Sequence, residues 1–298
     1  MLPRLIEPQL LASAREAPEG DGWIHEVKYD GFRLLCRVEG GRARLVTRGG
    51  NDWTARLPAV AGAVEALELG DAWLDGELVV LGRDGIPSFA ALQKALWRRG
   101  EGVAYQVFDA PWLDGRDRTA ECVLKRKARL EDAVAGRCAR GVVRYCDHLR
   151  GYGPEFFTRA FAAGLEGIVS KRVGTGYRAG VRSRGWLKVK CFHTLRFRVA
   201  GHTPGLEALL LCAVDGDGKR AYVGRVAGWA RAEVRHALRE ALEPLRRRAP
   251  FVDGADAEGP VRWVEPAVEV EVAALAWKPG DRLRHATLRR VVGTSAVG

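Results

Sequence analysis

The stretch Glu26-Val27-Lys28-Tyr29-Asp30-Gly31-Phe32-Arg33 places a lysine at the end of a predicted strand, just before a tight turn. A lysine held at this point can lie at the floor of a pocket and act as a nitrogen nucleophile. The alternative is a surface lysine before an Asp-Gly hairpin turn, and the stretch alone favours that alternative. The choice between them depends on the rest of the chain.

A second lysine pair lies far along the chain. Trp186-Leu187-Lys188-Val189-Lys190 alternates apolar and basic residues, which predicts a half-buried strand with Lys188 and Lys190 on one face. Two ammonium groups on one face suit a phosphate, and they would make a third lysine nearby easier to deprotonate. An amphipathic edge strand with a solvated basic face is the alternative.

Acidic residues interrupt two apolar segments. Leu74-Asp75-Gly76-Glu77-Leu78 carries two acids within a predicted strand, and Glu166 stands at the start of another. Acids against an apolar core are unfavourable unless they are paired or bind a metal. A hard divalent cation with phosphate oxygens would account for both positions, whereas a turn acid or a salt bridge would account for each one singly.

The first two-thirds of the chain mixes strand and helix patterns, which predicts an α+β domain. Ser88 is the expected N-cap of a helix that ends near Trp97. The other predicted helices are 57–69, 119–134 and 154–163, and the predicted strands are 23–28, 32–38, 42–47, 72–81, 103–108, 167–172 and 186–190.

Short strands dominate after residue 190. We predict strands at 195–201, 208–214, 221–226 and 268–276, and one helix at 230–247. About five short strands with one helix are typical of a small β-barrel of the oligonucleotide-binding type, the OB fold. The change of pattern near 191–193 predicts two domains, 1–191 and 192–298.

The formal net charge of +11 is spread over both halves and suits a polyanionic partner, most simply nucleic acid. A general preference for arginine would explain it equally well. The six cysteines form no C-x-x-C pair, which favours reduced thiols in a cytoplasmic protein over zinc or disulfides. We see no signal peptide and no membrane-spanning stretch, so no membrane partner is expected.

Four short motifs occur in a fixed order. They are K-x-D-G-x-R at 28–33, D-G-E at 75–77, E-G-[IV]-[VM]-x-K at 166–171 and W-x-K-x-K at 186–190. The set resembles that of the covalent nucleotidyltransferases, which are ATP-dependent DNA ligases, RNA ligases and messenger-RNA capping enzymes. Further stretches resemble the ligase domain of bacterial ligase D, namely 18–23, 47–54, 105–109, 182–186 and 283–288.

The resemblance implies a nucleotidyltransferase (adenylation) domain followed by an OB-fold β-barrel domain. It implies that Lys28 attacks the α-phosphate of ATP and retains AMP as a phosphoramidate. Glu26 would face the adenine amino group, and Phe108 would pack on the adenine ring. Arg33 and Arg48 would hold the ribose and phosphate, for which the arginine fork is apt.

The remaining roles concern the phosphates and the metal. Glu77 would bind the ribose or a metal, and Glu166 would be a second metal contact for Mg2+ or Mn2+. Lys188 and Lys190 would bind the α-phosphate. Arg284, in Leu283-Arg284-His285, would orient the departing pyrophosphate. Relatives usually continue Pro-Ser-Phe where this chain has Ala286-Thr287-Leu288, so a basic turn is the alternative for Arg284.

The implied reaction has three steps: AMP moves to the lysine, then to the 5′-phosphate of a nick, and the 3′-hydroxyl then displaces it. The implied partners are nicked or broken duplex DNA and a Ku-type end-binding protein, with the chain a monomer in the cytoplasm. No domain for nicotinamide mononucleotide is evident, so NAD is not the expected donor. The alternatives are an RNA ligase, a GTP-using capping enzyme and a non-catalytic nucleic-acid-binding module.

Overall fold

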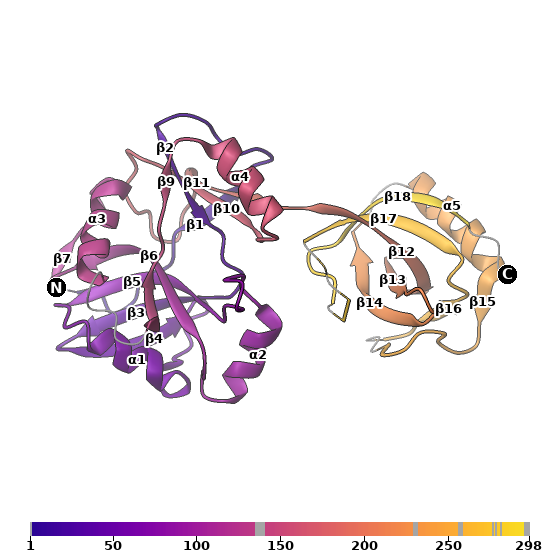
Figure 1. Ribbon diagram of the computed structural model, residues 1–298, viewed down its shortest axis with the longest axis horizontal. Helices are drawn as coiled ribbons and strands as arrows, with labels where there is room; N and C mark the ends of the chain where they lie inside the picture. Colours follow the sequence, from indigo (N-terminus) through magenta and orange to yellow (C-terminus); the bar gives the residue numbers. More distant parts are fainter. Residues whose placement is uncertain are drawn as a thin grey trace. The chain divides into compact units, whose positions relative to one another are not determined.

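The computed structural model describes residues 2–134, 141–228, 232–255, 259–275, 277, 279–280 and 282–294. The chain divides into two units, Met1–Cys191 and Phe192–Gly298 (Figure 1). Cys138, the predicted helix start at Ala230 and the predicted strand end at Ala276 lie outside the described residues.

Two sheets frame the first unit (Figure 1). The first sheet has the strand order β1-β11-β10-β2-β9, and the second has the order β4-β3-β5-β6-β7, with β8 parallel to β6. In chain order the strands are β1 (Leu10–Ser13), β2 (Trp23–Val27), β3 (Phe32–Glu39), β4 (Arg42–Thr47), β5 (Ala72–Val79), β6 (Ala104–Leu113), β7 (Arg116–Asp117), β8 (Val143–Tyr145), β9 (Leu149–Arg150), β10 (Gly167–Arg172) and β11 (Arg182–Lys190).

Two helices of the first unit are shorter than their patterns predict. The predicted helix 57–69 ends at Glu65, and Glu68 adopts a left-handed conformation with φ of 51°. The predicted helix 119–134 begins only at Val123, because Asp117 holds the preceding residues in a turn by accepting two hydrogen bonds from Thr119. The helices are the 3-10 helix η1 (Thr54–Arg56), α1 (Pro58–Glu65), α2 (Phe89–Trp97), α3 (Val123–Val134) and α4 (Gly153–Ala162).

Two glycines of the motifs are required by close backbone contacts rather than by turns. A Cβ atom on Gly31 would lie 2.0 Å from the carbonyl oxygen of Leu78. A Cβ atom on Gly167 would lie 2.1 Å from the carbonyl oxygen of Val189, and φ there is +155°. The missing side chains allow the start of β3 to lie close to β5 and the start of β10 to lie close to β11.

The second unit is a barrel-like sheet with one helix. The strand order is β14-β13-β12-β16-β15, and β17 pairs with both β12 and β18. The strands β16 and β18 were not predicted, and the predicted helix 230–247 ends at Leu242, before Pro244. The elements are β12 (His193–His202), β13 (Ala208–Val214), β14 (Arg220–Ala227), α5 (Ala232–Leu242), η3 (Glu243–Leu245), β15 (Arg246–Arg247), β16 (Arg262–Val264), β17 (Val268–Ala274) and β18 (Thr287–Thr294).

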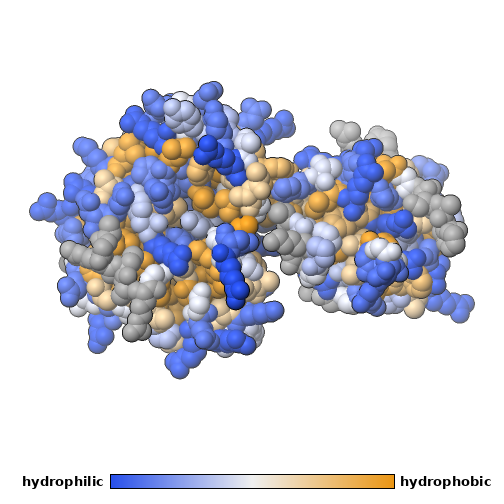
Figure 2. All heavy atoms as spheres, in the orientation of Figure 1, coloured by the Kyte–Doolittle hydropathy of each residue, from blue (hydrophilic) through white to orange (hydrophobic). Residues whose placement is uncertain are grey.

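Each unit has its own apolar core. In the first unit the core lies between the second sheet and the helices, and in the second unit it fills the barrel. Hydrophilic side chains cover much of the visible face of each unit (Figure 2). Over the part of the chain that the structure describes, none of the helices is both long and apolar enough to cross a membrane.

Candidate active site

Lys28 directly follows β2, where the first sheet positions it. Its backbone N–H donates to the carbonyl oxygen of Gly167 at 3.0 Å, which ties the residue to β10. Its Nζ lies 2.6 Å from Oε2 of Glu166, and the two side chains are 18% and 5% exposed. The lysine is therefore held by a carboxylate in a largely buried position.

The lysine pair of β11 lies beside this ion pair. Nζ of Lys190 is 3.2 Å from Oε1 of Glu166, so one carboxylate serves two lysines. The Lys188 ammonium group has no ion pair or hydrogen bond among the described residues. Burial lowers the pKa of Lys188, and the charges of Lys190, Lys28 and Arg182 lower it further. An anion bound here would relieve this accumulation of positive charge.

Glu77 reaches the same place from the second sheet. Burial raises the pKa of Glu77 to about 8, and Glu166 and Asp75 add to that rise, although Lys28 and Arg33 oppose it. Within the described ranges the Glu77 carboxyl has no hydrogen bond or ion pair. A half-buried acid without a partner is unfavourable, so this group is free to bind a ribose hydroxyl or a cation.

The Glu26 carboxylate is almost fully buried and is bound by two lysines. Nζ of Lys127 on α3 lies 2.6 Å from Oε1, and Nζ of Lys171 on β10 lies 2.8 Å from Oε2. Burial disfavours the charged form of Lys127, but Glu26 outweighs it and raises the pKa of Lys127. An adenine amino group would therefore meet a carboxylate whose two oxygens already accept hydrogen bonds.

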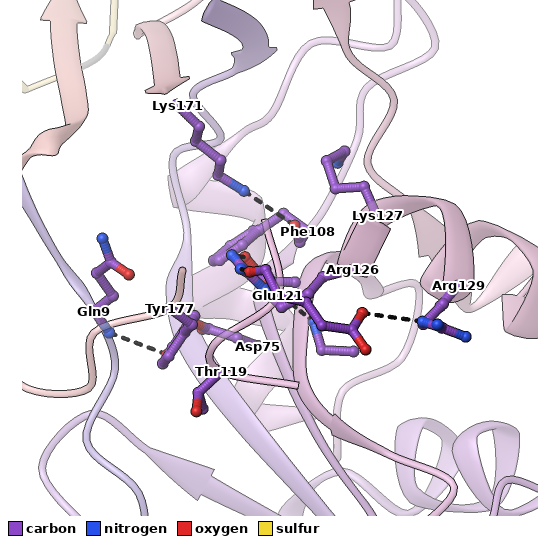
Figure 3. A network of polar contacts seen from close by, with 12 residues as sticks. Gln9, Asp75, Phe108, Thr119, Glu121, Arg126, Lys127, Arg129, Lys171 and Tyr177 are labelled. Carbon is purple, nitrogen blue, oxygen red and sulfur yellow. Dashed lines mark hydrogen bonds and ion pairs between the residues drawn. The ribbon is translucent and has the colours of Figure 1, made fainter. Parts of the chain in front are cut away.

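Arg33 is also engaged within the protein. Its fork binds the buried Asp75 at 2.9 and 2.6 Å, and Nη1 donates to the carbonyl oxygen of Gln9 at 2.7 Å. The Tyr177 hydroxyl donates to the same carboxylate at 2.7 Å and accepts from the backbone N–H of Gln9 (Figure 3). The fork that the sequence assigned to ribose or phosphate thus joins β3 to β5.

Phe108 lies where Lys171 and Arg33 meet. Nζ of Lys171 is 4.8 Å and Cζ of Arg33 is 5.2 Å from the centre of the Phe108 ring. Lys171 also donates to the Phe108 carbonyl oxygen at 3.0 Å (Figure 3). Trp186 makes an edge contact with the ring, and its buried Nε1 has no partner among the described residues. These contacts hold both the backbone and the ring of Phe108 in place.

Two predicted site residues take no part in the contacts described above. Arg48 follows β4 in an exposed turn. Arg284 belongs to the second unit, where its carbonyl oxygen accepts from the backbone N–H of Leu275. The roles of both residues therefore stay predictions. A cavity of about 650 Å³ in the second unit contains none of the predicted site residues.

The donor set fits a magnesium-type cation shared with phosphates. Among the described residues, no three His, Cys, Asp or Glu side chains gather in a metal-binding arrangement. Glu166 is close enough to Glu77 for its charge to raise the pKa of Glu77. One or two carboxylates are what Mg2+ takes from a protein when substrate phosphates complete its coordination.

The buried cations around this site were not predicted from the sequence. Arg126 and Asp109 form a fully buried pair at 2.8 Å, and Lys127 and Lys171 are also buried. Lys127 and Arg126 belong to a charged helix pattern that would look the same on a solvated helix. Lys171 closes a motif that was recognised, so its position in E-G-[IV]-[VM]-x-K was the one available signal.

Two family models match the chain. Residues 8–190 match the ATP dependent DNA ligase domain, and residues 202–292 match the ATP dependent DNA ligase C terminal region. The chain belongs to the ATP-dependent DNA ligase family. The predicted fold class, an adenylation domain followed by an OB-fold domain, is confirmed for this ligase.

The relatives of this ligase include ligase D proteins. It is 38% identical over 297 residues to the multifunctional non-homologous end joining protein LigD of Pseudomonas aeruginosa, and 33% identical over 279 residues to that of Mycobacterium tuberculosis. These matches cover 96% and 90% of this chain but only 35% and 36% of the relatives. The chain therefore spans about a third of their length.

Solved structures agree with these matches. The ligase resembles the structure described as mycobacterial DNA ligase D complexed with ATP and MES, with a TM-score of 0.59 and 30% identity over 96% of this chain and 94% of that one. The Mycobacterium tuberculosis LigD ligase domain gives a TM-score of 0.58 at 29% identity, over 96% and 94%. The predicted resemblance to ligase D is confirmed.

Proposed function

We propose that this ligase seals nicks and breaks in duplex DNA with ATP, through an AMP group carried on Lys28. The observation that supports this most directly is the cluster of Lys28, Glu166 and Lys190, with Lys188 beside it and Glu77 opposite. It combines a held amine, spare positive charge for phosphates and two acids. That combination is what nucleotidyl transfer to a lysine needs.

In the first step the Lys28 amine attacks the α-phosphorus of ATP. A phosphorus–nitrogen bond forms, the bond to the bridging oxygen breaks, and pyrophosphate leaves. Lys28 must give up a proton, and Glu166 Oε2, 2.6 Å from its Nζ, is placed to receive it. Lys188 and Lys190 would stabilise the charge that develops on the α-phosphate oxygens.

The metal is expected to be Mg2+ or Mn2+, held by Glu77 and Glu166 together with phosphate oxygens. It would supply neutralisation of the phosphate charge. The absence of a partner for Glu77 among the described residues supports this assignment, as does the effect of Glu166 on its pKa. Phe108 would pack on the adenine, while Glu26, with Lys127 and Lys171, would lie at its amino edge.

The later steps need the DNA and the second unit. AMP passes from Lys28 to the 5′-phosphate, and the 3′-hydroxyl then attacks that phosphate and releases AMP. We expect the barrel to bind backbone phosphates, Arg284 to help pyrophosphate leave, and Arg48 to contact the nucleotide. The junction between the units at Cys191 is the expected hinge for the changes between steps.

The similarity to end-joining proteins supports a role in the repair of double-strand breaks, with a Ku-type end-binding protein as partner. We expect the ligase to act as a monomer in the cytoplasm, where bacterial DNA lies.

Sealing of a labelled nick tests the proposed function. We expect joining of a DNA nick with ATP and a divalent cation, and none with GTP or NAD. A matched duplex with an RNA nick controls for the strand type. Joining of RNA alone, or joining with GTP in place of ATP, would contradict the proposal.

A further inference from the structure

Helix α2 ends in a tryptophan that the fold does not use. Trp97 is 88% exposed, the highest value among the large apolar side chains of the described residues. The core-facing side of α2 is already provided by Leu92 and Ala95, which are buried. Its indole offers a large flat ring, with a polar N–H, that a ligand could cover.

The residues around Trp97 are cationic. Lys94, Arg98 and Arg99 are all exposed, and within the described ranges none of the three takes part in an ion pair. The segment 94–101 contains a single acidic residue, Glu101. The end of α2 therefore offers one large aromatic ring and three unpaired positive charges within about two helical turns.

One of these cations occupies a conformation that favours glycine. The N–H of Gly100 donates to the carbonyl oxygen of Ala95 at 2.9 Å, which makes Arg99 the residue just past the helix end, where glycine is usual. The φ of Arg99 is +55°. A left-handed conformation is unfavourable for a residue with a Cβ atom, so the fold itself gains nothing from arginine here.

We propose that Trp97, with Lys94, Arg98 and Arg99, binds the DNA substrate at its break. The ring packs on a base face that the break exposes, and the three cations bind the neighbouring phosphates. Three adjacent cations suit backbone phosphates, and an aromatic ring among cations is typical of contacts to unstacked bases. A protein partner is therefore the weaker occupant. The inference rests on the proposed DNA ligase function.

Binding to two closed DNA dumbbells tests the proposal, one continuous and one with a single nick. The protein is first charged with AMP and then freed of divalent cation, so that the nick is not sealed, and affinity is measured by fluorescence anisotropy. We expect Trp97→Ala to weaken binding to the nicked dumbbell about tenfold, and binding to the continuous one much less. Trp97→Phe should restore most of the affinity. If Trp97→Ala binds the nicked dumbbell as tightly as the wild-type protein does, the proposal is overturned and a protein partner is left as the occupant.

Arg99→Gly separates recognition from stability. Relief of the left-handed arginine should raise Tm by about 2–4 °C, while loss of the cation weakens binding to the nicked dumbbell. Arg42→Gln removes another exposed cation, from β4, and should weaken binding less. A rise in Tm with unchanged affinity would count against the phosphate contact.

Uptake of AMP in the absence of DNA distinguishes failure of the Trp97 contact from failure of the proposed ligase function. Normal uptake by the Trp97 variants with wild-type affinity for the nick overturns the DNA contact alone. Failure of the wild-type protein to bind the nicked dumbbell overturns the DNA ligase function and the contact together.

Discussion

At the scale of single residues, the lysines of the site carry more positive charge than the neighbouring carboxylates of the protein neutralise. Glu166 serves both Lys28 and Lys190, and Lys188 is left without a partner among the described residues. Glu77 is left without one as well. These two groups are therefore the ones whose behaviour should change most when nucleotide and metal bind.

Lys188→Met should separate activity from stability. We expect it to slow transfer of AMP to the protein by about 10²–10³-fold, because a group that stabilises the developing phosphate charge is lost. Because the folded protein lowers the pKa of Lys188, the charged form is disfavoured on folding, and the variant should unfold at a higher urea concentration. A less stable variant with normal AMP transfer would contradict this role.

Glu77 should make stability depend on pH. Its pKa rises to about 8 on folding, so the folded state binds more protons than the unfolded chain between the ordinary carboxyl range and about pH 8. Its contribution to stability is then present at low pH and lost as the pH rises through this window. Relative to wild type, Glu77→Gln should gain Tm from pH 5 to pH 8 in metal-free buffer. A constant difference in Tm would show that the carboxyl is not perturbed.

At the scale of elements, buried ion pairs join strands and helices that are distant in sequence. Asp109 on β6 binds Arg126 on α3, and Asp75 on β5 binds Arg33 on β3. The element types were largely predictable from periodicity. The strand β1 was not, because its four residues are ordered by parallel pairing with β11, far along the chain.

The pair between β6 and α3 should be structurally essential. We expect Arg126→Met to lower the free energy of unfolding by about 3–5 kcal/mol, because Asp109 would be left buried and uncompensated. Arg42→Met is the matched control, since its ion pair with Glu65 is exposed and should be worth at most about 1 kcal/mol. Equal losses in the two variants, measured by urea unfolding, would refute the distinction.

The buried ion pairs are the part of the site that the sequence did not predict. Lys28, Glu166, Lys190 and Glu77 could be predicted because their motifs carry chemistry that a strand end can present. The sequence motif assigned Arg33 to the nucleotide, but it did not indicate that Asp75 would be the partner of Arg33. Which charged residues face each other on two paired strands depends on the register of the strands, and a single sequence does not determine that register.

At the scale of the whole molecule, the net charge of +11 should control binding of DNA. If about 6–10 phosphates are neutralised, affinity for a nicked duplex should fall by about 10³–10⁵ between 50 and 200 mM salt. Transfer of AMP from ATP to the protein should change far less, because it needs no DNA. A shallow salt dependence, measured by anisotropy, would mean that few phosphates are contacted.

Lys28 is the proposed carrier of AMP, and the intact mass of the protein shows whether it carries one. The protein is first treated with pyrophosphate to remove bound AMP, then incubated with a divalent cation and ATP, GTP or NAD. We predict that the wild-type protein gains the mass of one AMP from ATP alone, and that Lys28→Ala gains none. No gain in the wild-type protein, or an equal gain in Lys28→Ala, would contradict it.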